Sequence, residues 1–211
     1  FYSVSDEEVT VYLEHEGQIV QVEYLNESVY TNVSISKSGY TQVVPGQEIR
    51  YTFKDIGNNS TVPLDSFYWR DTLPTDAVRL DKIITGTYSA RLNYKVVFQT
   101  NLNDTQRVLA DNLNTQKNYT LDASPAALGL ASNEYVTQVT FLFGRVPGGF
   151  KQVETPYIYC DVLSSLSHEY RFANKCDVGG MWQNQWVQAT DRWVTIIYRG
   201  GPVPTLPRTG Y

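Results

Sequence analysis

The segment Glu48–Phe53 reads EIRYTF, an alternation of polar and apolar side chains that follows the turn pair Pro45-Gly46. Alternation of this kind places Ile49, Tyr51 and Phe53 on one face of a half-buried strand. The same pattern recurs at 9–13, 92–98 and, more loosely, 136–141, and turn residues bound each run. Together the runs predict about a dozen strands and an antiparallel β-sandwich.

The composition agrees with a folded β protein of 211 residues, because 13% of the residues are aromatic and only one is Met. Net charge is −5, and the 17 Lys and Arg residues are scattered along the chain. This excludes the basic footprint of a nucleic-acid-binding protein. No apolar run approaches the roughly 18 residues of a membrane span.

The predicted fold is an all-β, antiparallel, Ig-like sandwich with an N-terminal extension. Residues 1–28 form an acidic, hairpin-like β segment or connector, and residues 29–200 form the sandwich. Residues 201–211 are Pro-rich and form an extended tether. The one helix that the sequence suggests is a short one at Ser124–Leu128. The sequence begins at Phe1, without a start Met or a signal sequence. We therefore expect the chain to be a piece of a longer protein.

The sequence gives no support for enzymatic turnover. It contains no GxGxxG, P-loop or GxSxG motif, and His15 and His168 have no ligand or base at suitable spacing. We therefore expect no enzyme, no metal and no cofactor. Cys160 and Cys176 either pair as a disulfide or are two small buried hydrophobes.

Three polar side chains share the parity of apolar neighbours and are expected to point into the core. Lys37 alternates with Val33 and Ile35, whereas Lys54 and Lys95 fall on outward positions. Asp71 shares parity with Phe67 and Trp69, and Asn174 shares it with Tyr170, Phe172 and Cys176. Buried polar groups need partners. We therefore expect Lys37, Asp71 and Asn174 to meet.

The C-terminal pentapeptide, Leu206, Pro207, Arg208, Thr209 and Gly210, resembles the LPxTG sorting signal of Gram-positive surface proteins. The resemblance implies that a sortase cleaves after Thr209 and joins its carboxyl group to peptidoglycan. The expected location is therefore extracellular and cell-wall anchored. The hydrophobic span and basic tail that follow such signals are absent, so we expect the sequence to have been cut just past the signal.

A second resemblance covers about residues 33–178. The segments Ile35–Lys37, Pro45–Phe53, Asp71–Pro74 and Asn174–Val178 are similar in order to a repeat domain of unknown function from bacterial surface proteins. The order Lys, Asp, Asn also resembles that of CnaA-type collagen-adhesin and pilin domains. That resemblance implies an intramolecular isopeptide bond between Lys37 and Asn174, with Asp71 as the assisting acid.

The residues alone leave alternatives open. Lys37 and Asp71 could form an ordinary buried ion pair with Asn174 as a hydrogen-bond partner, and a Cys160–Cys176 disulfide could share the stapling.

The function that we expect is a monomeric, wall-proximal stalk or adhesin module, with sortase and peptidoglycan as partners. The alternative is a module that binds a glycan or host protein through Trp182, Trp186 and Trp193. We expect Trp186 and Trp193 to face the core, which would leave at most one Trp for a ligand.

Overall fold

The computed structural model describes residues 8–15, 17–25 and 29–200. Its chain contacts divide the protein into two units, Phe1–Tyr30 and Thr31–Tyr211. In the first unit, β1 (Glu8–His15) and β2 (Gln18–Leu25) pair as an antiparallel hairpin. Both strands fall within the segment expected at residues 1–28.

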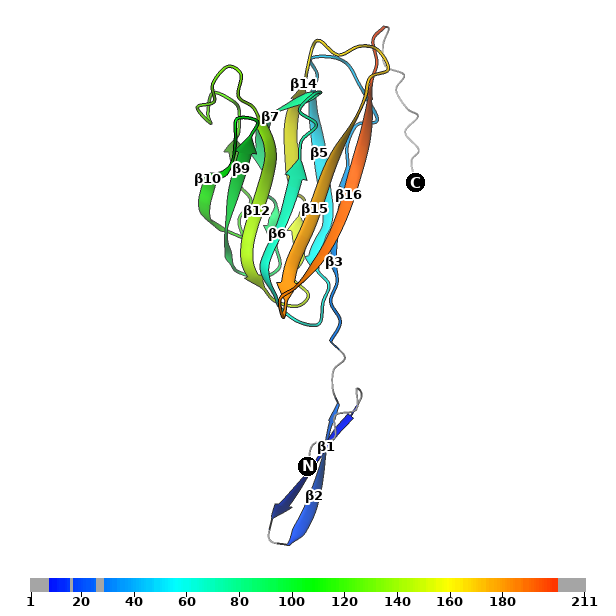
Figure 1. Ribbon diagram of the computed structural model, residues 1–211, viewed down its shortest axis with the longest axis vertical. Helices are drawn as coiled ribbons and strands as arrows, with labels where there is room; N and C mark the ends of the chain where they lie inside the picture. The colour runs from blue at the N-terminus through cyan, green and yellow to red at the C-terminus, as the bar shows by residue number, and fades with distance from the viewer. Residues whose placement is uncertain (1–7, 16, 26–28, 201–211) are drawn as a thin grey trace. The chain divides into compact units, whose positions relative to one another are not determined.

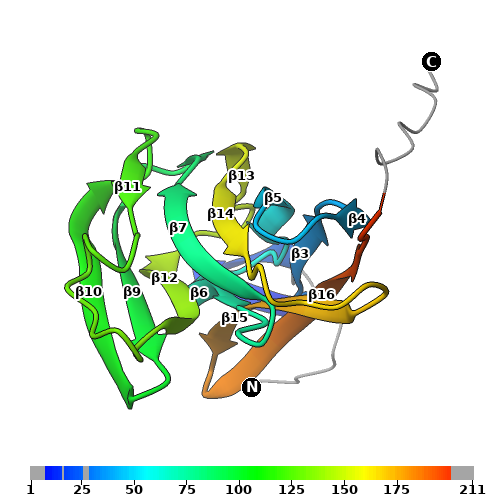
Figure 2. The same cartoon turned by 90° about the horizontal axis from the view of Figure 1, so that it is seen from above.

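The second unit is a sandwich of two large sheets, which face each other in Figure 2. The seven-stranded sheet has the order β10-β9-β12-β6-β15-β16-β4, and its central strands β12, β6 and β15 lie side by side in Figure 1. All its pairs are antiparallel except β16 with β4. The bounds are β4 (Gln42–Val43), β6 (Leu64–Thr72), β9 (Asn93–Thr100), β10 (Asn103–Asn114), β12 (Val136–Val146), β15 (Arg171–Trp182) and β16 (Gln185–Ile197).

The five-stranded sheet has the order β11-β7-β14-β5-β3, and all its pairs are antiparallel. Its strands are β3 (Val33–Ser38), β5 (Glu48–Asn58), β7 (Val78–Ile84), β11 (Thr120–Asp122) and β14 (Tyr157–Val162). A small ribbon of β8 (Thr87–Tyr88) and β13 (Gln152–Glu154) completes the described strands. The predicted all-β antiparallel sandwich is confirmed.

Aromatic side chains fill the space between the two sheets. Trp69 on β6 stacks on Phe141 of β12 with ring centroids 3.9 Å apart, and its ring lies 4.9 Å from that of Phe53 on β5. All three side chains are fully or almost fully buried. This packing supplies the apolar surroundings of the polar cluster described below.

The helix expected at Ser124–Leu128 is wrong, because this segment forms hydrogen-bonded turns. The Leu128 N–H donates to Ser124 O and the Leu130 N–H to Pro125 O, but no helix continues from them. Ala126 and Ala127 are exposed. In so short a segment, the packing of Leu128 against the core is too little to stabilise a helix.

Replacement of Trp69 by Ala should lower the free energy of unfolding by about 3–5 kcal/mol, because it leaves a large cavity between the sheets. Trp186→Ala is the matched control, since Trp186 is 53% exposed. That variant should change stability by less than about 1 kcal/mol. Urea denaturation followed by far-UV circular dichroism measures both. Equal losses would contradict the assigned core.

Candidate functional site

The first strand of the sandwich delivers Lys37 to the core, as its alternation predicts. Val33, Ile35 and Lys37 are buried along β3, while the residues between them are partly exposed. Lys54 and Lys95 are exposed, also as predicted. A lysine on an inward position of an otherwise apolar strand face requires a partner inside the protein.

Asp71 and Asn174 reach the same place from two neighbouring strands of the opposite sheet. Asp71 lies on the inner face of β6 and is fully buried, as is Asn174 on β15. The two strands pair with Asp71 opposite Cys176, so Asn174 is two residues away on the same face. The predicted inward placement of both residues is confirmed.

The three side chains form a single cluster, here called the Lys37–Asp71–Asn174 cluster. Lys37 Nζ donates to Asp71 Oδ1 at 2.7 Å, and neither side chain has any solvent exposure. Asn174 Nδ2 donates to the other carboxylate oxygen, Asp71 Oδ2, at 3.3 Å. One carboxyl group therefore contacts both the amine and the carboxamide, and the cluster joins β3 of one sheet to β6 and β15 of the other.

Aromatic rings enclose the amine. Lys37 Nζ lies 3.9 Å from the ring centroid of Phe53 and 4.5 Å from that of Tyr51, both on β5. These rings exclude water and leave few polar atoms near the cluster. Electrostatic effects at the cluster are therefore stronger than at the surface.

Burial controls the protonation of the acid. Desolvation raises the pKa of the Asp71 carboxyl group above its usual value, and the opposing influences of Lys37 and Asn174 offset only part of the rise. A raised pKa favours the neutral acid, which can donate a hydrogen bond as well as accept one.

Two polar atoms beside the cluster lack hydrogen-bond partners within the described part of the chain: Asn174 Oδ1 and the hydroxyl group of Tyr51. Burial raises the pKa of Tyr51, while Asn174 and Thr195 lie near enough to offset part of the rise without forming hydrogen bonds. A half-turn of the carboxamide would exchange its nitrogen and oxygen. Its oxygen would then accept a hydrogen bond from neutral Asp71.

The two cysteines are free, buried thiols, so the structure has the second of their two expected states. Burial raises the pKa of Cys176 to about 12 and that of Cys160 well above its ordinary value. Such thiols are unreactive at neutral pH. Cys176 lies directly opposite Asp71 in the pairing of β15 with β6, and both buried thiols act as small apolar fillers.

Asp191 is a further member of the site that the sequence argument did not identify. Its Oδ2 accepts a hydrogen bond from the backbone N–H of Lys37 at 2.7 Å. Asp191 lies on β16 and Lys37 on β3, so this bond joins the two sheets next to the cluster. The sequence does indicate this position, because alternation places Asp191 on the same inward face as Trp193 and Thr195.

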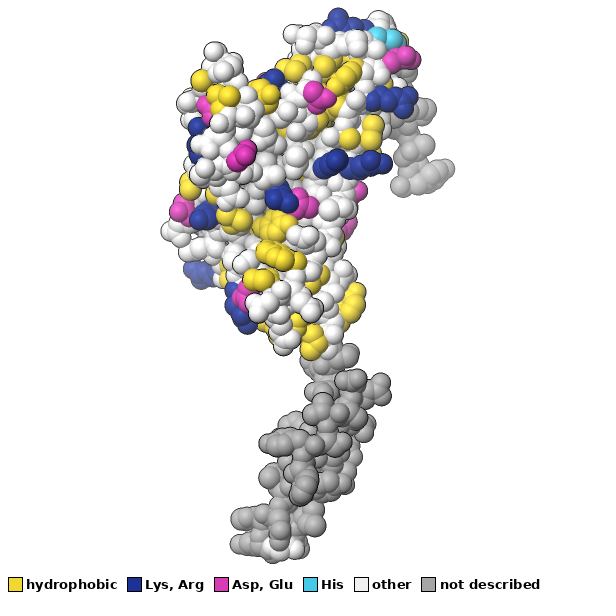
Figure 3. Space-filling model, in the orientation of Figure 1, with side chains coloured by type: hydrophobic (Ala, Val, Ile, Leu, Met, Phe, Trp, Pro, Cys, Tyr) yellow, Lys and Arg dark blue, Asp and Glu magenta, His cyan; other side chains and the backbone are white. Residues whose placement is uncertain are grey.

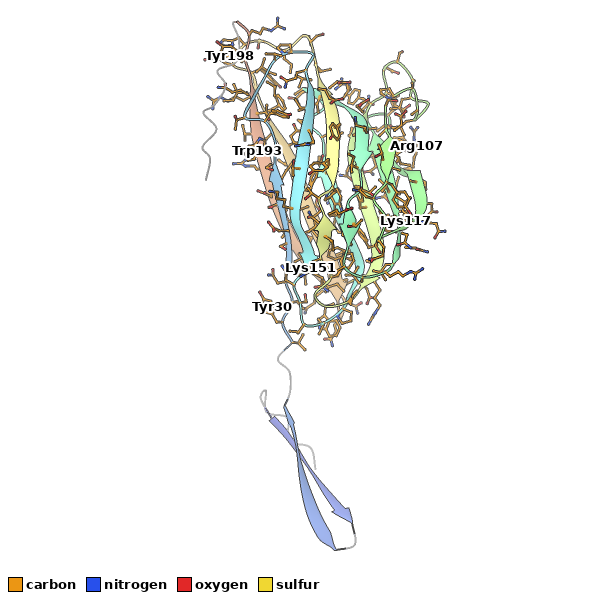
Figure 4. The ribbon with its side chains drawn as sticks, turned by 180° about the vertical axis from the view of Figure 1, so that it is seen from behind. Tyr30, Arg107, Lys117, Lys151, Trp193 and Tyr198 are labelled. Atoms are coloured by element: carbon orange, nitrogen blue, oxygen red, sulfur yellow. The ribbon has the colours of Figure 1, made fainter. Side chains whose placement is uncertain are left out.

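The tryptophans only partly match the expectation. Trp193 is partly buried and its Nε1 donates to Tyr40 O at 3.0 Å (Figure 4). Trp182 also packs on the core, but Trp186 is 53% exposed, so its predicted inward orientation is wrong. Trp186 and Trp193 are seven positions apart in β16, and an odd spacing turns two side chains to opposite faces of a strand.

Other candidate groups take no part in the cluster. His168 Nδ1 accepts from the Arg199 N–H, and its ring packs on Tyr198. Within residues 8–15, 17–25 and 29–200, no group of three or more His, Cys, Asp or Glu is arranged to hold a metal. The same residues include no helix long and apolar enough to cross a membrane. The sorting motif, Leu206 to Gly210, lies outside the described residues.

No protein-family model and no curated protein matches this chain. Among solved structures, it is similar to ACE19, the collagen-binding subdomain of the Enterococcus faecalis surface protein ACE. The identity is 12%, the match covers 81% of this chain and 98% of that one, and the TM-score is 0.32. The collagen-binding domain of a Staphylococcus aureus adhesin is 9% identical, with 81% and 100% of the two chains covered and a TM-score of 0.31.

AvmM, which catalyses macrocyclization in alchivemycin A biosynthesis, is also similar to the chain. It is 9% identical, with 92% of this chain and 99% of that one covered and a TM-score of 0.29. At such TM-scores, likeness to an adhesin or to an enzyme does not indicate what this chain binds or does.

The raised pKa of Asp71 gives the unfolding free energy a defined pH dependence, testable in a Lys37→Met background where the carboxyl group has no countercharge. A group whose pKa is raised on folding stabilises the protein below its ordinary pKa of 3.8. That stability is lost as the pH rises through the raised value, by about 1.4 kcal/mol per pKa unit.

Urea titrations from pH 4 to pH 8 should therefore show Lys37→Met losing stability relative to Lys37→Met/Asp71→Asn. Parallel pH profiles for the two variants would show that Asp71 is not desolvated.

Proposed function

We propose that this chain is a cell-surface stalk or adhesin module whose sandwich is closed by an isopeptide bond between Lys37 and Asn174. The observation that supports the bond is the double contact of Asp71, which holds the amine and the carboxamide in one water-free site. Asn174 Oδ1, buried without a partner, marks the carbonyl group to be activated.

The reaction requires no cofactor or co-reactant. Asp71 takes a proton from the Lys37 ammonium group, which leaves a neutral amine beside a neutral acid. Once the carboxamide has turned, Asp71 donates to Asn174 Oδ1, and Lys37 Nζ attacks Asn174 Cγ. Asp71 relays one proton from Nζ to the departing nitrogen, the Cγ–Nδ2 bond breaks, ammonia leaves, and an Nζ–Cγ amide remains. Each chain reacts once, so Asp71 assists a self-modification and we propose no enzymatic turnover.

The cross-link would stabilise the fold by closing a long loop from residue 37 to residue 174. In the chain-entropy treatment of cross-links, a loop of this length contributes about 5 kcal/mol. The position of the cross-link also matters for mechanical load, because β3 is the first strand of the sandwich and β15 belongs to its last hairpin. Tension applied to the two chain ends would pass through a covalent bond and bypass the strands between residues 37 and 174.

The C-terminal motif provides the proposed location. Sortase would cleave between Thr209 and Gly210 and attach the Thr209 carboxyl group to the peptidoglycan of a Gram-positive wall, which makes the protein extracellular. This part of the proposal rests on the five residues 206–210 and on the prolines before them, which favour the extended chain that a peptidase must bind.

The cross-link predicts that the denatured, fully reduced protein weighs one ammonia less than its composition. Lys37→Ala and Asp71→Ala should both have the full mass expected for their sequences, since each lacks the nucleophile or the acid. Lys54→Ala is the matched control, because Lys54 is exposed on the neighbouring strand β5 and should leave the ammonia loss intact. Intact-mass spectrometry measures all four.

A wild-type chain of full mass would refute the isopeptide bond, and the cluster would then be a buried ion pair with an amide partner. An ammonia loss that persists in Lys37→Ala would assign the lost ammonia to a different group.

Sorting is tested separately by incubation with a sortase and a triglycine nucleophile. Wild-type chain should be cleaved after Thr209 and gain the triglycine, whereas Thr209→Ala should remain intact. Mass spectrometry of the product checks the cleavage position. Cleavage elsewhere, or none, would remove the wall anchor from the proposal and leave the cross-link unaffected.

A further inference from the structure

The outer face of β6, β15 and β16 bears a set of side chains that neither the cross-link nor the sorting signal uses. Strand pairing arranges them in rows: Thr72–Lys175–Arg192, then Arg70–Asp177–Thr190, then Tyr68–Gly179–Gln188. Trp186 follows at the end, opposite Met181. We call this set the ladder face. Figure 3 shows Lys and Arg side chains over β15 and β16, with hydrophobic side chains below them.

The first row contains an electrostatic conflict. Lys175 and Arg192 are directly opposite each other on neighbouring strands and both are exposed. Like charges in opposite positions destabilise a sheet. In the part of the chain that the structure describes, no carboxylate lies within ion-pair distance of either side chain. The two positive charges would therefore attract an anion.

The second and third rows form a connected polar network. Arg70 Nε and Nη2 donate to the two oxygens of Asp177, each at 2.8 Å. The Tyr68 hydroxyl group donates to Asp177 Oδ2 at 2.8 Å and accepts from Gln188 Nε2 at 3.2 Å. Asp177 is already paired with Arg70 and forms no ion pair with Lys175. The network also fixes the orientation of the Arg70, Tyr68 and Gln188 side chains.

The far end of the ladder face is aromatic. Trp186 is 53% exposed and contacts Tyr68 edge to face, with ring centroids 6.2 Å apart. Trp186 and Arg192 lie six residues apart on β16, a span of about 20 Å. The first two rows line a hollow of about 630 Å³ together with Gln188, Cys176 and Asp191. The face thus presents cations, hydroxyl and amide groups, and an aromatic ring in sequence.

We propose that the ladder face binds an anionic polysaccharide. Carboxylate or sulfate groups would lie on Lys175 and Arg192, and sugar hydroxyls would bond to Thr72, Thr190 and Gln188. The exposed ring of Trp186 would stack on a sugar face.

A peptide is the less suitable occupant. A peptide that added as a strand would pair with the outer edge of β16, which β4 pairs with only at Ile196 and Ile197, and would leave the rows on β6 and β15 unused.

The first test titrates the full chain with chondroitin sulfate and hyaluronan octasaccharides by isothermal calorimetry at low salt. We expect binding to at least one of the two, an affinity that falls with added salt, and no binding to neutral maltooctaose. Lys175→Gln/Arg192→Gln should weaken binding by about tenfold or more. Trp186→Ala should also weaken it.

Lys95→Gln is the matched control, because Lys95 is exposed on the same sheet but on β9, away from the ladder face. It should leave binding unchanged. Failure of both octasaccharides to bind, or equal loss in Lys95→Gln and the double variant, would overturn the proposal. Equal affinity for an octaglutamate peptide would also overturn it, in favour of an acidic protein segment.

A second readout requires no ligand. Lys175→Gln should raise the melting temperature, since it removes the repulsion from Arg192, whereas Lys95→Gln should not. A lower melting temperature for Lys175→Gln would show that its charge is already compensated in the free protein and would overturn the proposal.

Discussion

A single buried carboxyl group links the two sheets of this sandwich. Asp71 receives the Lys37 amine from one sheet and the Asn174 carboxamide from the strand beside it. An amine and an acid this far from water are tolerated only while they stay paired, because an isolated charge there would be strongly destabilising. The rings of Phe53 and Tyr51 cover the amine on the side of β5.

The positions of Lys37 and Asn174 along the chain determine how the cluster would carry tension. Lys37 belongs to the strand by which the chain enters the sandwich, and Asn174 to the hairpin by which it leaves. Asp191 reinforces the junction by accepting from the Lys37 backbone. A bond here would shield the intervening strands from tension. It would also anchor β15 next to Lys175, so the ladder face would keep its shape while the module is pulled.

Simple alternation in the sequence was enough to predict the inward positions of Lys37, Asp71 and Asn174, because burial alternates regularly up to Lys37 on β3 and around Asn174 on β15, and Asp71 keeps the parity of Phe67 and Trp69 on β6. The same rule, applied consistently, would have turned Trp186 outward and Asp191 inward. Which strands pair could not be predicted, since pairing depends on contacts between residues far apart in the chain. The ladder face was therefore invisible: Lys175 and Arg192 become neighbours only through the register of β15 with β16.

The most direct test of the central claim is to stretch single molecules from their two ends by force spectroscopy. With the cross-link in place, only the β1–β2 hairpin and the parts of the sandwich outside residues 37–174 can extend, so the contour length should increase by about 15 nm or less. Lys37→Ala should instead release the whole sandwich, an increase of about 50 nm. A wild-type chain that extends as far as Lys37→Ala would contradict the claim that a covalent bond carries the load.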